Sequence, residues 1–394
     1  MNILVLNSGS SSIKFQVIRM PSEILVCEGI VERIGMEDAR VGYEAGGQRH
    51  STMQPILSHR AALEIICDLL IAPEKGIIGT ASGITAIGHR VVHGGRLFSA
   101  TTRVTENVKK EIASFIPLAP LHNPQNLEGI QIAEDLFPGA AQVAVFDTAF
   151  HRSMPMKARK YAIPDNFYEE FGIQAYGFHG TSHKYVSETA IAYLGKKDVR
   201  LLCLHLGNGC SITAIKDGKS MDHSLGFGPS NGLIMGSRSG DIDHSLIFYL
   251  VNTLDYPLQE VERILTRESG LLGLTGHSDL RDIQAGAEAG NTACTLALEM
   301  SAYRIRKYIG AYAAVLNGLD VLVFTAGIGE NSAYMRKLVC TDMEFLGIHL
   351  DESRNTSPST DLREIQATGS RVRIMVIPTN EELEIARQTY NLIR

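Results

Sequence analysis

The ionisable side chains of this chain gather in short phrases that also contain glycine, proline or small polar residues. In α/β folds the ends of the strands face the ligand crevice, so polar groups at strand ends are better candidates for chemistry than those along helices. Arg90 and Arg238 are the candidate anion-binding residues, with a surface salt bridge as the ordinary alternative for each. The phrases are GHRVVHGG (88–95), PLHNP (120–124), FDTAFH (146–151), GFHGTSH (177–183) and MGSRSGDIDH (235–244).

The histidines allow more than one interpretation. His179 and His183 have the four-residue spacing of two metal ligands on one helix face. The residues between them read as a turn, and the glutamate of an H-E-x-x-H motif is absent, so a zinc site is not expected. His122, which precedes Asn123 and Pro124, could pack behind a helix start or take part in chemistry.

Two carboxylates are candidates for metal binding. Asp147 ends an otherwise apolar strand, where it could cap a turn or hold Mg²⁺ through water, as Mg²⁺ is usually held in phosphate sites. Glu381 lies in the phrase TNEE, in which Glu382 is the expected capping-box partner of Thr379. Glu381 is then available for another task.

Three strand–turn segments are expected to position these groups: NILVLNSGSSSIKFQVI (2–18), LLCLHLGNGCSITAIKDGK (201–219) and VLVFTAGIGEN (321–331). Glycine turns allow backbone N–H groups to approach phosphate oxygens, and a following helix N-terminus favours negative charge. The full P-loop pattern G-x-x-x-x-G-K-[ST] is absent, because residue 213, five before Gly218-Lys219-Ser220, is threonine, and no G-x-G-x-x-G follows the first strand, which excludes a P-loop and a dinucleotide fold. The first two segments look like a duplicated hairpin. A duplicated α/β fold that binds phosphates is therefore predicted.

Composition limits the class of protein. A chain of 394 residues with 44% apolar and 20% charged residues is long enough for two globular domains. The net charge of −6, without a lysine and arginine stripe, argues against a nucleic-acid partner. No apolar run approaches the ~20 residues of a membrane span, and none reads as a signal peptide, so a cytoplasmic location and no membrane partner are expected. The six cysteines form no C-x-x-C pair, which fits reduced core residues.

Strands and helices are predicted to alternate, which implies a mostly parallel sheet flanked by helices. The expected N-terminal domain is 1–148 plus 382–394, and the expected nucleotide-binding C-terminal domain is 149–381. Residues 352–370 read as a surface loop. The expected helices are 59–71, 124–136 with Asn123 as N-cap, 292–316 and 380–391, and further strands are expected at 142–146, 320–325 and 371–377.

Read together, these phrases resemble the signature of the acetate kinase family, the short-chain acyl kinases that make acyl phosphates with ATP. The matching phrases run in order from Asn2 to the C-terminus: NSGSSSIKF, GHRVVHGG, PLHNP, FDTAFH, YGFHGTSH, HLGNGCS, GSRSGDID, FTAGIGENS and IPTNEELEIAR. The resemblance implies the duplicated two-domain α/β fold shared by acetate and sugar kinases, heat-shock ATPases and actin. It also implies a homodimer.

The resemblance assigns catalytic roles to matching residues of this chain. It implies that Arg90 and Arg238 bind the carboxylate and the moving phosphoryl group, that His179 is a transition-state donor, and that His122 supports the same charge. A carboxylate nucleophile is already ionised at pH 7, so no general base is needed and Asp147 is expected to organise a metal. The implied ligands of Mg²⁺ or Mn²⁺ are Asp147, Glu381 and Asn7.

Binding roles follow from the same resemblance. The small apolar pocket for the acyl methyl group would consist of Val92, Leu121, Phe178 and Pro229. The implied residues for ATP or ADP are Lys14, His205, Gly207, Asn208, Gly209, Asp279, Leu280, Arg281, Gly327, Ile328, Gly329, Glu330 and Asn331.

The implied reaction is reversible, ATP-dependent phosphorylation of a short-chain carboxylate, acetate or propionate, by direct in-line transfer. The sequence departs from the family at 222–233, where DHSLGFGPSNGL replaces the typical D-T-S-M-G-F-T-P-L-E-G-L. The loss of bulk near Pro229 leaves the identity of the acid open. Two alternatives remain: a related acyl kinase with another acid or pyrophosphate as partner, and a non-catalytic nucleotide-binding protein.

Overall fold

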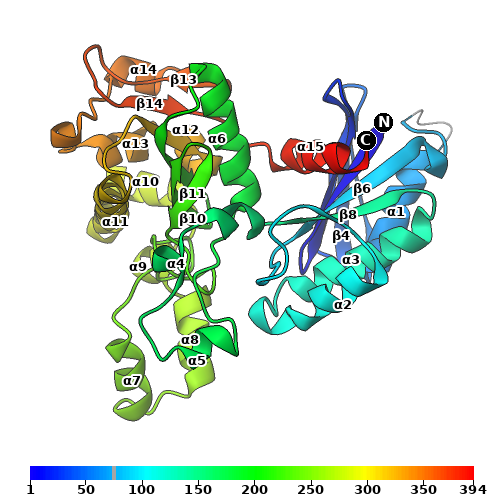
Figure 1. Cartoon of the computed structure of the whole chain (residues 1–394), viewed down its shortest axis with the longest axis horizontal. Helices are drawn as coiled ribbons and strands as arrows, with labels where there is room; N and C mark the ends of the chain where they lie inside the picture. The colour runs from blue at the N-terminus through cyan, green and yellow to red at the C-terminus, as the bar shows by residue number, and fades with distance from the viewer. Residues whose placement is uncertain (73–76) are drawn as a thin grey trace. The chain divides into compact units, whose positions relative to one another are not determined.

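The computed structural model describes residues 1–72 and 77–394, and the chain divides into two compact units (Figure 1). Unit 1 consists of Met1–Phe150 and Asn380–Arg394, and unit 2 consists of His151–Thr379. The boundaries expected from the sequence differ from this division by two residues at each junction. Each unit has its own sheet and its own helices.

The sheet of unit 1 has the strand order β5-β4-β3-β2-β1-β6-β8-β7. The first hairpin forms as predicted, because β1 pairs antiparallel with β2 across the turn at residues 9–11. On its other side β1 pairs parallel with β6, and β6 pairs parallel with β8. The strands are β1 (Asn2–Ser8), β2 (Ser12–Arg19), β3 (Ile24–Glu32), β4 (Met36–Ala45), β5 (Gln48–Ile56), β6 (Ile84–Val91), β7 (Thr102–Arg103) and β8 (Ala141–Phe146).

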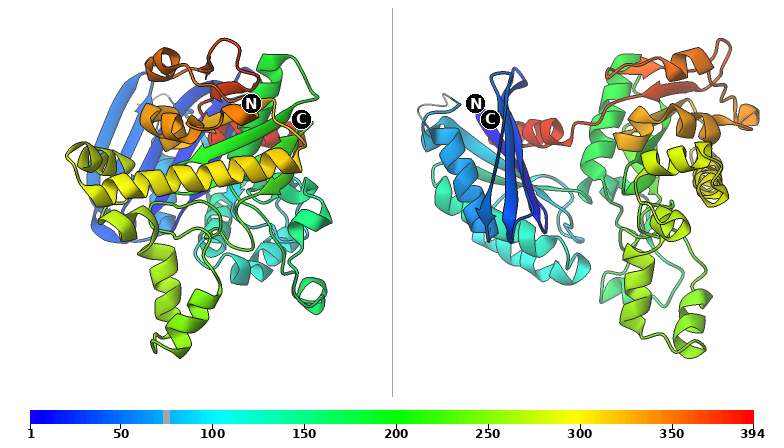
Figure 2. Two further views of the ribbon diagram at one scale, coloured as in Figure 1. Left: turned by 90° about the vertical axis from the view of Figure 1, so that its left-hand side faces the viewer. Right: turned by 180° about the vertical axis from the view of Figure 1, so that it is seen from behind.

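Helices cover both faces of this sheet (Figure 2, right). The side chains of β1 alternate between the faces, as the period of two in a strand requires. Leu4 and Leu6 pack into the core beneath α1 and α3, whereas Ile3 and Val5 pack against Ile385 of α15. The helices are α1 (His59–Ile71), α2 (Glu106–Ser114), α3 (Asn123–Leu136) and α15 (Glu381–Ile393).

Unit 2 repeats this arrangement. Its sheet has the order β11-β10-β9-β12-β14-β13, in which β11, β10 and β9 are antiparallel and β9, β12 and β14 are parallel. The same sequence of pairings runs through β3, β2, β1, β6 and β8 of unit 1. The duplication predicted from the two hairpins is therefore confirmed. The strands are β9 (Arg200–Leu206), β10 (Cys210–Lys216), β11 (Lys219–His223), β12 (Val321–Thr325), β13 (Arg363–Glu364) and β14 (Arg373–Val376).

The helices of unit 2 differ widely in length. The longest, α11, covers 292–315, close to the predicted 292–316. No helix among the described residues is long and apolar enough to cross a membrane. The helices are α4 (Met156–Arg159), α5 (Asn166–Glu169), α6 (Gly180–Leu194), α7 (Ser245–Asn252), α8 (Leu258–Arg267), α9 (Gly270–Thr275), α10 (Leu280–Glu288), α11 (Thr292–Val315), α12 (Ala326–Asn331), α13 (Ala333–Cys340) and α14 (Glu352–Thr356).

The expectation of a mostly parallel sheet was wrong for both units. Most neighbouring strands are antiparallel, because short turns join each strand to the next from β1 through β5 in unit 1 and from β9 through β11 in unit 2. A parallel neighbour needs a crossover of a dozen or more residues, which only the later strands have.

Three local predictions also differ from the structure. Residues 352–370 are not wholly a loop, because Asp351 caps α14 by accepting a hydrogen bond from the Arg354 N–H, and β13 follows. The N-cap of α15 is Asn380, which accepts from the Leu383 N–H at 2.9 Å, so the capping box of Thr379 and Glu382 does not form. Helix α3 begins at Asn123 itself, with His122 as its N-cap.

The contact between β6 and α15 generates a stability prediction. A Cβ atom on Gly88 of β6 would lie 2.5 Å from Thr389 Oγ1 and 2.7 Å from Ile385 Cγ2, both on α15. Gly88→Ala should therefore lower the free energy of unfolding by about 1–3 kcal/mol, the usual cost of overpacking. Urea denaturation and amide hydrogen exchange in α15 measure this loss.

Gly139→Ala is the matched control, because a Cβ atom at Gly139 meets nothing within 4 Å. It should change the stability by no more than about 0.5 kcal/mol. Equal stabilities of the two variants would show that α15 does not pack tightly on β6.

Candidate active site

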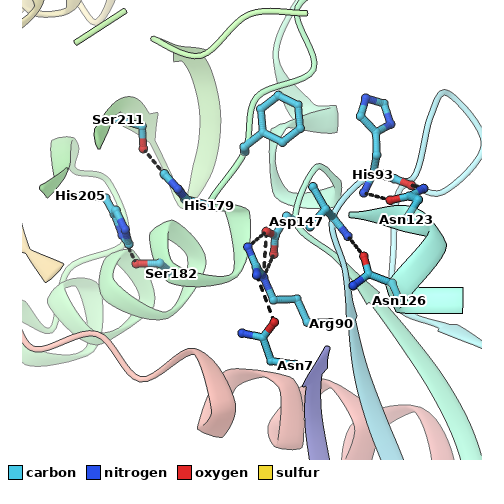
Figure 3. A network of polar contacts seen from close by, with 12 residues as sticks. Asn7, Arg90, His93, Asn123, Asn126, Asp147, His179, Ser182, His205 and Ser211 are labelled. Atoms are coloured by element: carbon cyan, nitrogen blue, oxygen red, sulfur yellow. Dashed lines mark hydrogen bonds and ion pairs between the residues drawn. The ribbon is translucent and has the colours of Figure 1, made fainter. Parts of the chain in front are cut away.

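Arg90 and Asp147 form an ion pair where two parallel strands of unit 1 end. Arg90 is near the end of β6 and Asp147 directly follows β8, so both side chains emerge at the same sheet edge (Figure 3). Arg90 Nε lies 3.0 Å and Nη2 2.6 Å from Asp147 Oδ2, and the two side chains are 22% and 1% exposed. Arg90 Nη1 donates to Asn7 Oδ1 at 3.2 Å, which brings the first hairpin to the same edge.

Glu381 adds a second carboxylate to this cluster. Burial raises the pKa of Glu381 to about 7; the positive charge of Arg90 opposes this shift, and the neighbouring Asp147 and Glu382 carboxylates reinforce it. Burial alone would lower the pKa of the Arg90 guanidinium, but Asp147 and Glu381 together hold that pKa above its ordinary value.

The chemistry of this donor set fits Mg²⁺. Two neighbouring carboxylates repel each other unless a cation lies near them, and Mg²⁺ usually takes one or two protein carboxylates together with water and substrate phosphates. No group of three or more histidine, cysteine, aspartate or glutamate side chains among residues 1–72 and 77–394 is arranged to hold a metal by itself.

Two asparagines of α3 hold the segment that follows Arg90. Asn126 Oδ1 accepts from the Val92 N–H at 3.0 Å, and its Nδ2 donates to the Ser8 carbonyl at 2.8 Å. Asn123 makes a reciprocal pair with His93, accepting from its N–H and donating to its carbonyl, both at 3.1 Å. Sequence reasoning treated Asn123 only as a helix cap and did not single out Asn126. The available signal was a pair of amides three residues apart in the first turn of α3.

The other predicted residues of unit 1 differ in exposure. Val92 is 6% exposed, whereas Leu121 is 56% exposed and the neighbouring His122 is also exposed. Lys14 lies directly opposite Asn7 in the register of β1 and β2, so both belong to the first hairpin as expected.

In unit 2, His179 stands at the start of α6. Its backbone is left-handed, with φ of 56°, and residues 180–182 form the first turn of α6, where a separate turn was predicted. The Nδ1 atom of His179 is 3.0 Å from Ser211 Oγ, and its ring stacks on His205 with centroids 4.3 Å apart (Figure 3). The Nδ1 atom of His205 in turn lies 2.8 Å from Ser182 Oγ.

The glycine turn of the second hairpin lies against His179 and Arg238. A Cβ atom on Gly209 would be 3.4 Å from His179 Nε2 and 3.7 Å from Arg238 Nη2. Arg238 Nη1 donates to the Pro229 carbonyl at 2.6 Å, and burial lowers the pKa of its guanidinium. The Arg238 guanidinium and the His179 imidazole thus lie beside the backbone of Gly209, which has no side chain. This arrangement is suited to an oxyanion such as a phosphoryl group.

A cavity of about 600 Å³ in unit 2 joins three segments that were predicted separately. The cavity is lined by Gly207, Asn208, Ser278, Asp279, Leu280, Arg281, Gln284, Gly327, Ile328, Asn331 and Ser332. Sequence reasoning missed Ser278, Gln284 and Ser332. Gln284 lies one helical turn after Leu280 on α10, a spacing that could have revealed it.

Two residues assigned to nucleotide binding have other partners. Glu330 Oε1 accepts from the Thr379 N–H at 3.0 Å, and the carbonyl of Gly329 accepts from Arg336 Nη1 at 2.9 Å. Neither residue lines the cavity. The backbone is left-handed at Ala326, the first residue of α12, with φ of 63°. Phe178, assigned to the acyl pocket, is 3% exposed and its N–H donates to His223 Nε2 at 3.1 Å.

Buried Arg336 of α13 holds the backbone of α12 through hydrogen bonds. The residue is 2% exposed and donates to the carbonyls of Gly329 and Glu330, both at 2.9 Å, as well as to the side chain and carbonyl of Asn355, both at 2.8 Å. Burial lowers the pKa of Arg336 to about 10. Four carbonyl oxygens therefore replace a carboxylate partner.

Comparison with known proteins identifies the relatives of this chain. Residues 2–387 match the model of the acetokinase family. Acetate kinases of Flavobacterium johnsoniae and Thermotoga maritima are 55% and 48% identical, over 100% of this chain and 100% and 99% of their own lengths. The crystal structures of Porphyromonas gingivalis acetate kinase and of a propionate kinase from Francisella tularensis each have a TM-score of 0.94 and 42% identity, with both chains fully covered.

The chain belongs to the acetokinase family, and it is a kinase. The family resemblance and the duplicated fold predicted from the sequence are therefore confirmed.

The carbonyl contacts of Arg336 generate a second prediction. Arg336→Met removes every donor while keeping a long apolar side chain, so buried carbonyl oxygens lose their partners. The free energy of unfolding should fall by about 2–4 kcal/mol, and amide exchange in α12 should accelerate. Urea denaturation and hydrogen exchange measure both effects.

Arg354→Met is the control, because Arg354 is 53% exposed and its carboxylate partner Asp351 is 3.8 Å away. An exposed pair of this kind contributes at most about 1 kcal/mol. If the two variants were equally stable, Arg336 would not support α12.

Proposed function

We propose that this chain catalyses the reversible, ATP-dependent phosphorylation of acetate to acetyl phosphate by direct in-line phosphoryl transfer. The observation that carries the proposal is the convergence of His179 Nε2 and Arg238 Nη2 on the Gly209 turn, next to residues 207 and 208 of the 600 Å³ cavity. The curated acetate kinases that cover the whole chain support the same reaction.

Phosphoryl transfer depends mainly on positioning and on neutralising charge at the equatorial oxygens. Arg238 and His179 supply donors for these oxygens, and the backbone of the glycine turn allows close approach. The adenosine part of ATP would occupy the cavity lined by Asp279, Arg281 and Gly327, among others.

Arg90 is the proposed carboxylate-binding residue. Its hydrogen bonds to Asp147 and Asn7 hold the guanidinium plane in one orientation and use the Nε–H and one hydrogen on each Nη atom. A guanidinium has five N–H groups, so one on each Nη atom remains for an acetate or phosphoryl oxygen. His122 is proposed to support the transferred charge, and Val92, Leu121, Phe178 and Pro229 to contact the acyl group.

Mg²⁺ would be held by Asp147 and Glu381, with Asn7 as a further ligand, and when bound it neutralises phosphate charge. A carboxylate nucleophile needs no general base, so the proposal gives Asp147 the task of orienting Arg90 and the metal. We further propose that the protein is a homodimer and is located in the cytoplasm.

Propionate is a second candidate acid. Among the solved structures, a propionate kinase from Francisella tularensis is as similar to this chain as the acetate kinase of Porphyromonas gingivalis, with a TM-score of 0.94 and 42% identity for each. The altered loop at 222–233 also lacks bulk at Gly228, where a Cβ atom would meet nothing within 4 Å.

A hydroxamate assay with ATP, Mg²⁺ and acetate, propionate or butyrate tests the function. Acetate and propionate should give acyl phosphate, with kcat/KM values that differ by no more than about 200-fold, because one methylene is worth about 1–3 kcal/mol. No product from any acid, with ATP hydrolysis also absent, would overturn the proposal.

The role of Arg238 leads to a kinetic prediction. Arg238→Lys keeps a positive charge but replaces a planar fork by a point charge, so it cannot contact the Pro229 carbonyl and a phosphoryl oxygen in the same way. The value of kcat should fall by about 10²- to 10³-fold, as after removal of one oxyanion donor. Steady-state kinetics measure the loss.

Arg267→Lys serves as the control, since Arg267 is an exposed residue at the end of α8. Its kinetics should match those of the unmodified protein. A near-normal kcat for Arg238→Lys would exclude Arg238 as a donor to the transferred group.

A further inference from the structure

Behind His179 lies a cluster of four further histidines, which are 0–8% exposed. His205 stacks on His179, and His183 lies behind His205 with ring centroids 6.0 Å apart. His183 also packs edge-on against His223, at 5.2 Å, and His151, at 5.8 Å. The proposed reaction uses His179 and assigns no role to His183.

One hydroxyl group connects His179 to His183. Ser211 Oγ is 3.0 Å from His179 Nδ1 and 2.7 Å from His183 Nε2, and Ser211 is fully buried on β10. A serine hydroxyl has one proton and can donate it to only one of these nitrogens. When Ser211 donates to one ring, the other ring must therefore donate to Ser211.

The surroundings of His183 decide the direction. Its Nδ1 atom is buried and has no hydrogen-bond partner in the part of the chain that the structure describes. An unsatisfied buried N–H group costs more than a bare ring nitrogen, so the single proton of neutral His183 belongs on Nε2. Burial, reinforced by His151 and His205, lowers the pKa of His183 well below its ordinary value, which keeps the ring neutral.

The consequence for His179 follows step by step. His183 donates from Nε2 to Ser211 Oγ, and because Ser211 Oγ has no third hydrogen-bond partner among the described residues, its own proton is donated to His179 Nδ1. The proton of neutral His179 then lies on Nε2, the atom beside the Gly209 turn and Arg238. A neutral histidine with this tautomer is a hydrogen-bond donor toward that side of the ring.

We propose that Ser211 and His183 are positioning residues that hold His179 in the tautomer with its proton on Nε2, so that His179 donates to the transferred phosphoryl group. The proposal rests on the role given to His179 in the proposed function. The proposal gives buried His183 a role in fixing which ring nitrogen of His179 carries the proton.

Kinetics of a matched pair of variants test the proposal. Ser211→Ala removes the connection between the two rings, so kcat should fall by about 10- to 100-fold, the usual effect of losing a partner that orients a functional histidine. The KM values for ATP and acetate should stay within about twofold, because the lost interaction acts in the transition state.

Ser220→Ala is the matched control. Ser220 is also fully buried, and its Oγ lies 3.0 Å from Nδ1 of His151, but it does not contact His179. Ser220→Ala should leave kcat within about twofold of the unmodified protein. Equal kcat values for the two variants would overturn the proposal.

Long-range ¹⁵N–¹H correlation spectra of the ligand-free unmodified protein report the tautomer without any activity measurement. The His179 signals, identified by their loss in His179→Ala, should have the pattern of a ring protonated on Nε2. The Ser211→Ala spectrum should show a mixture of tautomers. A wild-type ring protonated on Nδ1 would overturn the proposal even if Ser211→Ala failed to fold.

His179→Ala separates this proposal from the proposed function. If His179→Ala kept a normal kcat, the role of His179 in phosphoryl transfer would be wrong. If His179→Ala lost activity while Ser211→Ala kept it, only the role of Ser211 and His183 would be wrong.

Discussion

Parallel pairing of the central strands is the constraint on which the candidate site residues of each unit depend. In unit 1, β1, β6 and β8 run in the same direction, so Asn7, Arg90 and Asp147 all emerge at one edge of the sheet. In unit 2, β9 and β12 do the same, and the turn at Gly207 and the start of α12 share an edge. Reversing one of these strands would carry its terminal residues to the opposite edge, about 13–17 Å away for a strand of five or six residues at about 3.3 Å per residue.

Desolvation is the main cost of this arrangement, and each charged group meets it differently. Asp147 is almost fully buried and accepts several hydrogen bonds from Arg90. Among the described residues, the hydrogen-bond acceptors of Arg336 are carbonyl oxygens, and burial lowers its pKa. Burial likewise lowers the pKa values of His183 and His223, so these rings remain neutral. Neutral rings that pack on one another can fill the interior behind His179 without adding charge to it.

Much of the fold and of the candidate site follows from local sequence signals. The two hairpins, the glycine turn at residues 207–209 and the strand before α12 are recognisable because apolar runs end at small and polar residues. Whether neighbouring strands run parallel or antiparallel was not recognisable in the same way. The strands β3, β4 and β5 were not predicted. Strands β4 and β5 carry many polar residues and are largely exposed, so they lack the apolar run that revealed β1 and β9, whereas β3 does contain apolar residues at 24–27 that gave no prediction.

Residues that hold segments distant in sequence escaped prediction for a different reason. Asn126, Ser211 and Arg336 each contact a segment that is distant in sequence, and nothing in their immediate neighbours indicates the partner. A side-chain amide in a first helical turn normally reads as a cap, and a serine in a strand reads as an ordinary β residue. Only the folded chain reveals that these groups satisfy backbone or imidazole atoms close to the candidate site.

The residues of the phrase GIGEN, 327–331, make different kinds of contact. Gly327, Ile328 and Asn331 line the cavity of unit 2, whereas the Glu330 carboxylate accepts from the Thr379 N–H, and Thr379 Oγ1 is 2.8 Å from Ser182 Oγ. Thr379 is followed by the N-cap of α15 and then by Glu381. The chain therefore reaches Glu381 from a residue that is fixed by α12 and α6. Within unit 2, Glu330 therefore holds the backbone of Thr379, whereas its neighbours Gly327, Ile328 and Asn331 line the cavity.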